Sequence, residues 1–216
     1  MTPILPGATL GVMGGGQLGR MFVHAAQRLG YFTAVLDPAA DSPAGHVSHH
    51  HIHAAYDDAA GLTQLATVSA AITTEFENVP AAALQQLAAT RPVAPNANTV
   101  SIAQNRIDEK SHFSACAAAS GVLCAPYAVL ETQAQLTAVS ADLLPGILKT
   151  ARMGYDGKGQ ARVKDAAELA SAWNSLGNVA CVLEKMLPLK AELSVIVARG
   201  WNGEIVSFAP QRNVHV

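Results

Sequence analysis

Residues 1–100 alternate short apolar runs with longer stretches of helical spacing. The runs at 8–13, 32–36 and 70–75 have the length of buried strands. Helical spacing follows each of them, at 17–29, 57–68 and 81–89. Strands that alternate with helices form a parallel sheet that is covered on both faces. The pattern therefore predicts an α/β domain in this part of the chain.

The pattern changes after residue 98 to an α+β arrangement with antiparallel strands. Residues 98–119 are expected to be mostly helical, with a break near Asn105. A turn at Gly200, Trp201, Asn202 and Gly203 predicts a hairpin. The remaining expected elements are strands at 127–130, 146–150, 161–163 and 179–184, helices at 133–139 and 166–176, and hairpin arms at 192–198 and 204–208.

Composition narrows the class of protein. Of the 216 residues 50% are hydrophobic and only 14% are charged, which excludes a disordered polar chain. Lys and Arg number 14 against 16 Asp and Glu, so no basic excess indicates a nucleic-acid or membrane partner. The longest stretch without Asp, Glu, Lys or Arg, residues 111–130, contains Gly121 and Pro126 and does not resemble a membrane span. We expect no nucleic acid and no membrane as partners.

Cysteine usage and the amino end indicate the compartment. The first basic residue is Arg20, so the chain lacks the positive start of a signal peptide. Cys116, Cys124 and Cys181 are odd in number and form no C-x-x-C pair. We interpret them as reduced, buried thiols of a cytoplasmic protein.

A glycine loop follows the first predicted strand and opens a helix. Residues Gly14 to Gly19 satisfy G-x-G-x-x-G, and Asp37 ends the next strand 18 residues further on. In dinucleotide-binding proteins such a loop approaches a pyrophosphate, and the acid binds a ribose. Three readings stay open at this point: an NAD(P)-dependent oxidoreductase, a tight turn without a ligand, or a site for another phosphorylated ligand.

A second glycine loop favours a nucleotide triphosphate. Gly154, Gly157 and Gly159 lie within six residues and could form a flap over polyphosphate. The loop is not a Walker motif, because Gln160 stands where that motif needs lysine. A triphosphate requires several cations. The candidate cations are Arg106, Lys149 and Lys158.

Two acids downstream extend this nucleotide hypothesis. Glu184 follows an apolar strand, as in a slot for a nucleobase, where it could accept from an exocyclic amine. Glu192, eight residues later, could accept from ribose hydroxyls. A glutamate at the end of a strand is more often simply exposed to solvent. The nucleotide hypothesis therefore rests on the order of the cations, the glycine loop and the two acids along the chain, and less on any one of these features.

Four segments now show a resemblance to a known family. The chain resembles the ATP-grasp ligases of the 5-(carboxyamino)imidazole ribonucleotide synthase family along all 216 residues, with its motifs in the same order. The segments that carry the resemblance are GGGQLGRM at 14–21, TEFENVP at 74–80, QNRIDEK at 104–110 and GYDGKGQ at 154–160.

The resemblance implies a fold class and domain limits. It implies an α/β protein with a Rossmann-like preceding ATP-grasp domain of parallel sheet at residues 1–100. A small α+β ATP-grasp lid with linker helices is expected at 101–186, and the truncated start of the large ATP-grasp domain at 187–216. On this reading the sequence is cut inside a domain.

The resemblance also implies roles for individual residues. Tyr155, Asp156 and Lys158 match catalytic positions, and Asp37 becomes a structural residue. Gly15, Gly16, Gln17, Leu18 and Glu75 match positions that face the ribonucleotide substrate. The implied nucleotide contacts are Arg106, Lys149, Gly154, Tyr155, Asp156, Gly157, Lys158, Gly159, Gln160, Glu184, Lys185, Met186, Leu187, Glu192 and His215.

The implied activity is ATP-dependent carboxylation of 5-aminoimidazole ribonucleotide with bicarbonate in purine biosynthesis. ATP and Mg²⁺ are the implied cofactors, with the metal ligands expected beyond Val216, and the family suggests a homodimer. We therefore expect this chain by itself not to catalyse the ligation. The alternatives are an NAD(P)-dependent oxidoreductase that uses Gly14 to Gly19, or a non-catalytic nucleotide-binding fragment.

Two further groups have unassigned chemistry. His46, His49, His50, His51 and His53 form a dense cluster, which we interpret as a variable surface stretch rather than a metal site. Glu75 and Glu77 flank Phe76, and strand alternation would point both to the same side, as an acid pair, a substrate wall or structural acceptors.

Overall fold

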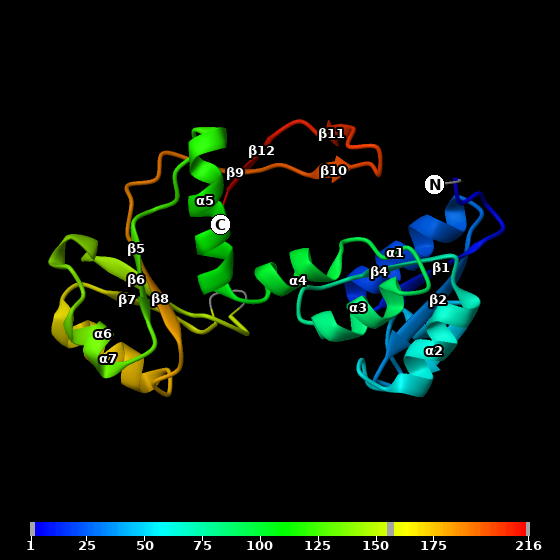
Figure 1. The fold of residues 1–216 in the computed structure, drawn as a ribbon, viewed down its shortest axis with the longest axis horizontal. Coiled ribbons are helices and arrows are strands. Elements are labelled where there is room, and N and C mark those ends of the chain that lie inside the picture. The colour runs from blue at the N-terminus through cyan, green and yellow to red at the C-terminus, as the bar shows by residue number, and fades with distance from the viewer. Residues whose placement is uncertain (1–2, 155–157, 215–216) are drawn as a thin grey trace.

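The chain folds around two four-stranded sheets that lie at opposite ends of the molecule (Figure 1). This computed structural model describes residues 3–154 and 158–214. Helices α4 (Ala97–Ala103) and α5 (Arg106–Ser120) connect the two sheets. Two short β ribbons follow the second sheet, and one of them extends back toward the first sheet in the view of Figure 1.

The first sheet is parallel throughout, as the alternation of strands and helices predicts. Its order is β3-β2-β1-β4, and β1 pairs with both β2 and β4. The strands are β1 (Thr9–Met13), β2 (Phe32–Asp37), β3 (His50–His53) and β4 (Ala71–Thr74). The helical connections and flanks are α1 (Gln17–Arg28), the 3-10 turn η1 (Gly45–Val47), α2 (Ala59–Val68) and α3 (Ala81–Ala88).

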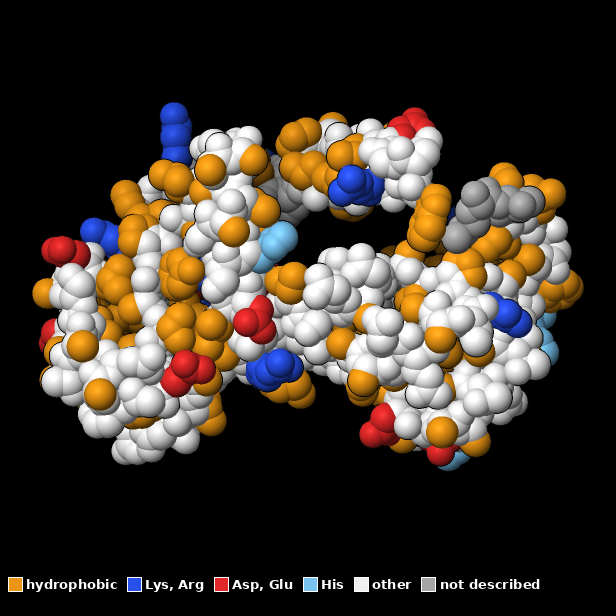
Figure 2. Space-filling view, in the orientation of Figure 1, with side chains coloured by type: hydrophobic (Ala, Val, Ile, Leu, Met, Phe, Trp, Pro, Cys, Tyr) orange, Lys and Arg blue, Asp and Glu red, His pale blue; other side chains and the backbone are white. Residues whose placement is uncertain are grey.

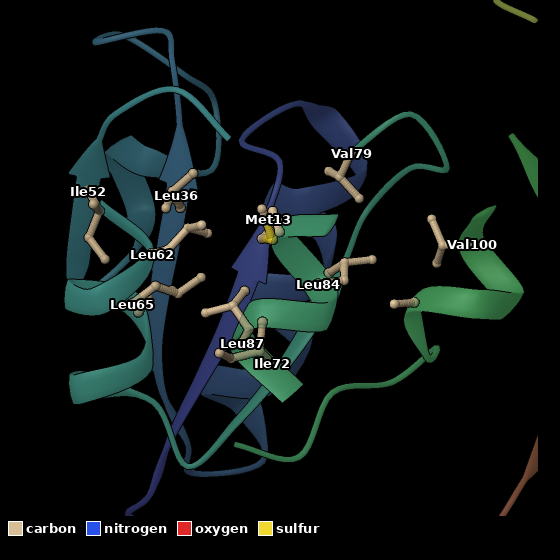
Figure 3. Packing of buried hydrophobic residues seen from close by; sticks show 13 residues of the cluster. Met13, Leu36, Ile52, Leu62, Leu65, Ile72, Val79, Leu84, Leu87 and Val100 are labelled. Atoms are coloured by element: carbon tan, nitrogen blue, oxygen red, sulfur yellow. The ribbon is translucent and has the colours of Figure 1, made fainter. Parts of the chain in front are cut away.

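Alternate residues of the central strands supply two separate cores. Val12 and Val35 pack with Val23 of α1 on one face. Met13 and Leu36 point to the other face, where α2 and α3 cover them (Figure 3). This alternation is the side-chain period of a strand, and it fixes the register of the sheet.

The break expected near Asn105 separates α4 from α5. Asn105 has an extended backbone, and its side chain accepts from the backbone N–H of Ile107 at 3.1 Å as the N-cap of α5. Val100 of α4 packs into the core of the first sheet. No residue of α5, all of which is described, is buried. The linker is therefore anchored to the first body through α4, and α5 lies more openly against the second.

The second sheet is antiparallel with the order β5-β8-β6-β7. Leu148 and Leu183 are register partners whose side chains meet Leu169 and Trp173 of α7 in a dry core. On the opposite face, α5 lies against β8, and the charged side chains of Lys149 and Glu184 stand beside the buried Val182. The elements are β5 (Tyr127–Leu130), α6 (Gln133–Thr137), η2 (Ala141–Leu143), β6 (Gly146–Thr150), β7 (Gln160–Val163), α7 (Ala166–Ser175) and β8 (Cys181–Lys185).

The predicted hairpin forms between β10 (Val197–Arg199) and β11 (Ile205–Ser207). A second pairing, β9 (Glu192–Ser194) with β12 (Gln211–Asn213), was not expected. Figure 2 shows hydrophobic side chains on the surface of these ribbons. Trp201, in the turn between β10 and β11, is 81% exposed.

The structure corrects two further expectations. His50–His53 is an edge strand, whereas no strand was predicted there, because three histidines around one isoleucine give no apolar run. Only Cys181 is buried, since Cys116 lies on the open helix α5 and is exposed. The domain limits at residues 100 and 186 stay predictions. Among the described helices, none is both long and apolar enough to cross a membrane.

The first core predicts a clear contrast between two leucines. Leu65 of α2 is 0% exposed in the core, and Leu29 at the end of α1 is 68% exposed. Leu65→Ala should lower the free energy of unfolding by about 2–5 kcal/mol, because it leaves a cavity. Leu29→Ala should change it by less than about 0.5 kcal/mol. Urea unfolding, monitored by circular dichroism, measures both losses of unfolding free energy. Equal losses would contradict the burial of Leu65 and the exposure of Leu29.

Candidate functional site

Carboxylates of the chain itself occupy the backbone donors of the first glycine loop. The N–H of Gly15 donates to Asp37 Oδ2 at 2.6 Å, and that of Gly16 to Glu75 Oε1 at 3.0 Å. The N–H of Gly19 also donates to Glu75. These are the donors that a dinucleotide phosphate would need. In this structure the loop is therefore closed by internal acceptors.

The same carboxylate explains why the loop consists of glycines. A Cβ on Gly14, Gly16 or Gly19 would collide with the side chain of Glu75. The glycines let the side chain of Glu75 approach the backbone of the loop, so their presence does not require a bound pyrophosphate. Of the residues predicted to face a ribonucleotide, Gly15, Gly16 and Glu75 meet here, while Gln17 and Leu18 are exposed on the first turn of α1.

Asp37 has three donors within the fold, as a structural residue should. Besides Gly15, it accepts from the N–H of Ala39 at 2.8 Å and from the hydroxyl of Tyr56 at 2.7 Å. Burial, followed by the hydrogen bond to Asp37 and its negative charge, raises the pKa of Tyr56 above its ordinary value. Tyr56 therefore remains a protonated donor.

An acidic cavity of about 320 Å³ adjoins this loop. Asp37, Asp41 and Glu75 line it, and its described lining contains no lysine or arginine. A pyrophosphate bound at the N–H groups of this loop would have to displace Asp37 and Glu75, which already accept from them. The geometry thus argues against the oxidoreductase alternative.

The second site gathers cations on the face of the second sheet that lies toward α5. Lys149 on β6 and Glu184 on β8 are diagonal neighbours in the register, in which Glu184 faces Ile147 and Lys149 faces Val182. Lys149 Nζ lies 3.1 Å from Glu184 Oε1. Lys110 of α5 reaches the same carboxylate, with its Nζ 3.0 Å from Oε2. One acid therefore holds two lysines from different elements.

The charge of Glu184 is set by competing influences. Burial is the largest and would raise its pKa, but hydrogen bonds and charges from Lys110 and Lys149 together outweigh it and lower the pKa. Glu184 is therefore ionised near neutral pH, and the three side chains carry one net positive charge. Its expected role toward an exocyclic amine stays a prediction, because both of its oxygens already accept from lysines here.

Arg106 adds a further cation beside the second glycine loop. Its backbone N–H donates to the carbonyl of Ala151 at 2.8 Å, which ties the start of α5 to the end of β6. Its side-chain Nε is buried and has no hydrogen-bond partner among the described residues. The residue lines a small cavity of about 30 Å³ with Met153 and Gly154. A buried donor without an acceptor is costly, and an anionic ligand at this loop would relieve that cost.

The described ends of the glycine loop close on β6. The N–H of Thr150 donates to the carbonyl of Gly159 at 2.8 Å, and Gln160 pairs with Lys149 in the register of β6 and β7. Lys158 belongs to the described part of the loop. The predicted site residues Tyr155, Asp156, Gly157 and His215 lie outside the described residues.

After Glu184 the chain reaches the end of β8 and leaves the second sheet. The N–H of Lys185 donates to Pro126, and that of Met186 to Pro145, so the backbone leaves the sheet in a fixed path. Met186 and Leu187 are exposed. Glu192 on β9 accepts from the side-chain amide of Asn213 on β12 at 2.7 Å. Its ribose role stays a prediction.

Lys110 is the site residue that sequence reasoning missed. It belongs to the segment QNRIDEK, from which only Arg106 was chosen as a candidate cation. The spacing from Arg106 to Lys110 is one helical turn, which places both on one face of a helix. That spacing was the available signal.

The two glutamates around Phe76 do not form an acid pair. β4 ends at Thr74, so strand alternation does not extend to them. Glu75 turns to the glycine loop, while Glu77 accepts from the side chain of Asn78 at 3.1 Å and lines the small cavity near Arg106. Each acid therefore serves a different site.

The histidines have separate partners. His49 Nδ1 accepts from the N–H of Thr33, and His51 Nε2 lies 3.3 Å from Ser42 Oγ. Within residues 3–154 and 158–214, no group of three or more His, Cys, Asp or Glu side chains is arranged to hold a metal ion.

Comparison with known proteins identifies both halves of the chain. Residues 7–104 match the model of the ribonucleotide synthetase preATP-grasp domain, and residues 115–216 match that of the ATP-grasp domain. An N5-carboxyaminoimidazole ribonucleotide synthase of Bacillus subtilis is 41% identical over 98% of this chain. The chain spans 55% of the length of that relative.

Solved structures agree with this assignment. An N5-carboxyaminoimidazole synthetase of Staphylococcus aureus complexed with ADP matches all of this chain with a TM-score of 0.92 and 35% identity, over 57% of its own length. The enzyme of Aspergillus clavatus in complex with ADP and 5-aminoimidazole ribonucleotide matches 97% of the chain with a TM-score of 0.83 and 31% identity, over 54% of its own length. The chain therefore combines a ribonucleotide synthetase preATP-grasp domain with ATP-grasp sequence in that order, and over nearly its whole length it is similar to N5-carboxyaminoimidazole ribonucleotide synthases.

Proposed function

We propose that this chain supplies the nucleotide-binding face of an enzyme that carboxylates 5-aminoimidazole ribonucleotide with ATP and bicarbonate. The proposal is carried by two observations at the second sheet: Lys110 and Lys149 meet at Glu184, and Lys149 and Arg106 lie next to the described ends of the second glycine loop, at Gln160 and Gly154. Cations gathered at a glycine loop are typical of polyphosphate sites. The relatives crystallised with ADP, and in one case also with the aminoimidazole ribonucleotide, support this choice.

In this proposal the cations and the loop divide the work of binding ATP. Lys149 and Arg106 neutralise phosphate charge, and residues 154–160 cover the phosphates. Residues 184–187 border the adenine, and Glu192 and His215 contact the nucleoside part. Gly15, Gly16, Gln17, Leu18 and Glu75 face the ribonucleotide, where the carboxylate of Glu75 offers acceptors for hydroxyl or amine groups.

The proposed reaction proceeds in two steps. A bicarbonate oxygen attacks the γ-phosphorus of ATP, which releases ADP and forms carboxyphosphate. The amine of the ribonucleotide then attacks the carboxyl carbon, phosphate leaves, and the amine loses a proton. Tyr155, Asp156 and Lys158 are the proposed catalytic residues at the second loop. The task of the protein is to position the reactants, neutralise charge and exclude water from a labile intermediate.

The proposal includes Mg²⁺, homodimer formation and a cytoplasmic location. Mg²⁺ prefers oxygen ligands, usually carboxylates together with substrate phosphates. The described residues do not fit a metal site, because they present no suitable group of three acids or histidines. No step is therefore assigned to a metal held by them. The three unpaired cysteines are compatible with the cytoplasm.

Nucleotide preference tests this proposal. Calorimetric titration should show tighter binding of ATP than of NADH. Lys149→Gln should weaken ATP binding by about tenfold, which is the loss of roughly 1.4 kcal/mol of interaction. Lys164→Gln is the matched control, because the side chain of Lys164, just after the edge strand β7, is 83% exposed. Tighter binding of NADH than of ATP would refute the proposal.

The activity of the longer protein provides a second readout. A protein that contains this chain and the remaining length of its relatives should form ADP only when bicarbonate and the aminoimidazole ribonucleotide are both present. ADP formation that does not depend on the ribonucleotide would contradict the assigned substrate.

Acid should selectively weaken the cluster around Glu184. Because the pKa of Glu184 is lowered in the folded chain, its stabilising effect is present above the unfolded pKa of about 4.3 and is lost as the pH falls through the folded pKa. Glu184→Gln should therefore cost more than about 1 kcal/mol of unfolding free energy at pH 7 and progressively less on acidification.

Glu168→Gln is the matched control for this experiment. The side chain of Glu168 is 45% exposed, and its ion pair with Lys164 is long at 4.0 Å. Glutamine keeps an acceptor for the backbone N–H of Lys164, which donates to Glu168 at 2.9 Å, so the change should cost less than about 0.5 kcal/mol at any pH. Urea titrations between pH 3 and 7 measure both variants. A cost for Glu184→Gln that does not change with pH would contradict the ionised state of Glu184.

A further inference from the structure

Lys110 is fixed against the second sheet although its helix lies in the open. No residue of α5 is buried, yet the side chain of Lys110 is only 12% exposed. Its Nζ lies 3.0 Å from Glu184 Oε2 and 5.9 Å from the ring centre of Tyr127. Tyr127 and Glu184 are register partners on β5 and β8, so one ammonium group contacts both strands. Such ordering of a long side chain costs entropy and indicates a specific role.

The carboxylate of Glu184 is divided between two lysines. Oε2 binds Lys110, and Oε1 binds Lys149 at 3.1 Å. The side chain of Glu184 is 11% exposed, so water cannot readily replace a lost partner. Removing one member of a buried ion pair leaves an uncompensated charge. If Lys149 moved to a ligand and Lys110 were absent, Glu184 would be a buried carboxylate without a cation beside it.

We propose that Lys110 is a positioning residue for nucleotide binding: it keeps Glu184 paired, so that Lys149 can turn from Glu184 to the phosphates of ATP. This inference rests on the proposed function, since it assumes that Lys149 binds the nucleotide. Without Lys110, Glu184 retains Lys149 as its sole cation, and ATP must compete with an internal carboxylate. Lys110 thereby controls a binding residue on another element without contacting the nucleotide.

Two simpler roles make different predictions. As a mechanical brace between α5 and β8, Lys110 would be needed whatever residue occupies position 184. As a general source of positive charge, it would attract ATP equally with glutamate or glutamine at that position. Only the proposed role makes the effect of Lys110 depend on the negative charge of Glu184.

A double-mutant cycle separates these roles. ATP affinity is measured by calorimetry at one salt concentration for the unaltered chain, Lys110→Met, Glu184→Gln and the double variant. Lys110→Met should weaken ATP binding by about tenfold when Glu184 is present and by less than about twofold in the Glu184→Gln background. Lys164→Met is the matched control and should leave the affinity unchanged, since Lys164 is exposed.

Each result decides the inference. Equal losses in the two backgrounds, or no loss in Lys110→Met, would overturn it while leaving ATP binding by the unaltered chain intact. Failure of the unaltered chain to bind ATP would instead overturn the proposed function, and the inference with it. Circular dichroism shows whether each variant folds. Should Lys110→Met unfold, Lys110→Gln replaces it in the cycle, and Lys110→Arg should restore binding to within about threefold by keeping the charge.

Discussion

A carboxylate remains ionised inside a protein only when cations or hydrogen-bond donors lie against it. Glu184 meets this condition by using a lysine from the neighbouring strand β6 and one from the linker helix α5. The pairing ties α5, none of whose residues is buried, to the strands β6 and β8. It also satisfies the charges of Lys110, Lys149 and Glu184, so that these side chains can be largely buried between α5 and the sheet. The position of α5, the orientation of Lys149 and the cationic character of this face all depend on it.

Strand alternation explains why this charged face can exist beside a stable core. Leu148 and Leu183 project to the side of α7, and their neighbours Lys149 and Glu184 project to the other side. One set of short strands thus carries a packed apolar face and a charged face at once. The first sheet uses the same alternation differently, because helices cover both of its faces and leave the functional groups at the ends of its strands.

Much of this arrangement could be predicted from local pattern. The parallel order of the first sheet follows from apolar runs that alternate with helical spacing, and the break at Asn105 follows from a residue type that caps helices. The strand β3 could not be predicted in this way. Its pairing with β2 is a tertiary effect, and His50, His51 and His53 do not favour a strand by themselves.

Side-chain partners were less predictable than elements. Glu184 was expected to meet a ligand, but its lysine partners come from 35 residues earlier on β6 and from α5, which no local spacing connects. Glu75 and Glu77 were expected on one side, and the end of β4 at Thr74 separates them. Such outcomes depend on where a strand ends and which helix packs against it. Those are properties of the whole fold.

The closure of the first glycine loop by Glu75 means that the chain carries an internal mimic of an anionic ligand. The acid reaches the N–H of Gly16 from 59 residues further along the chain. One six-residue signature therefore has two physical solutions: an open anion hole, and a joint that links two strands of the sheet. What distinguishes them is a distant carboxylate rather than anything within the signature. In this chain the distant acid makes the glycine loop part of the connection between the ends of β1 and β4.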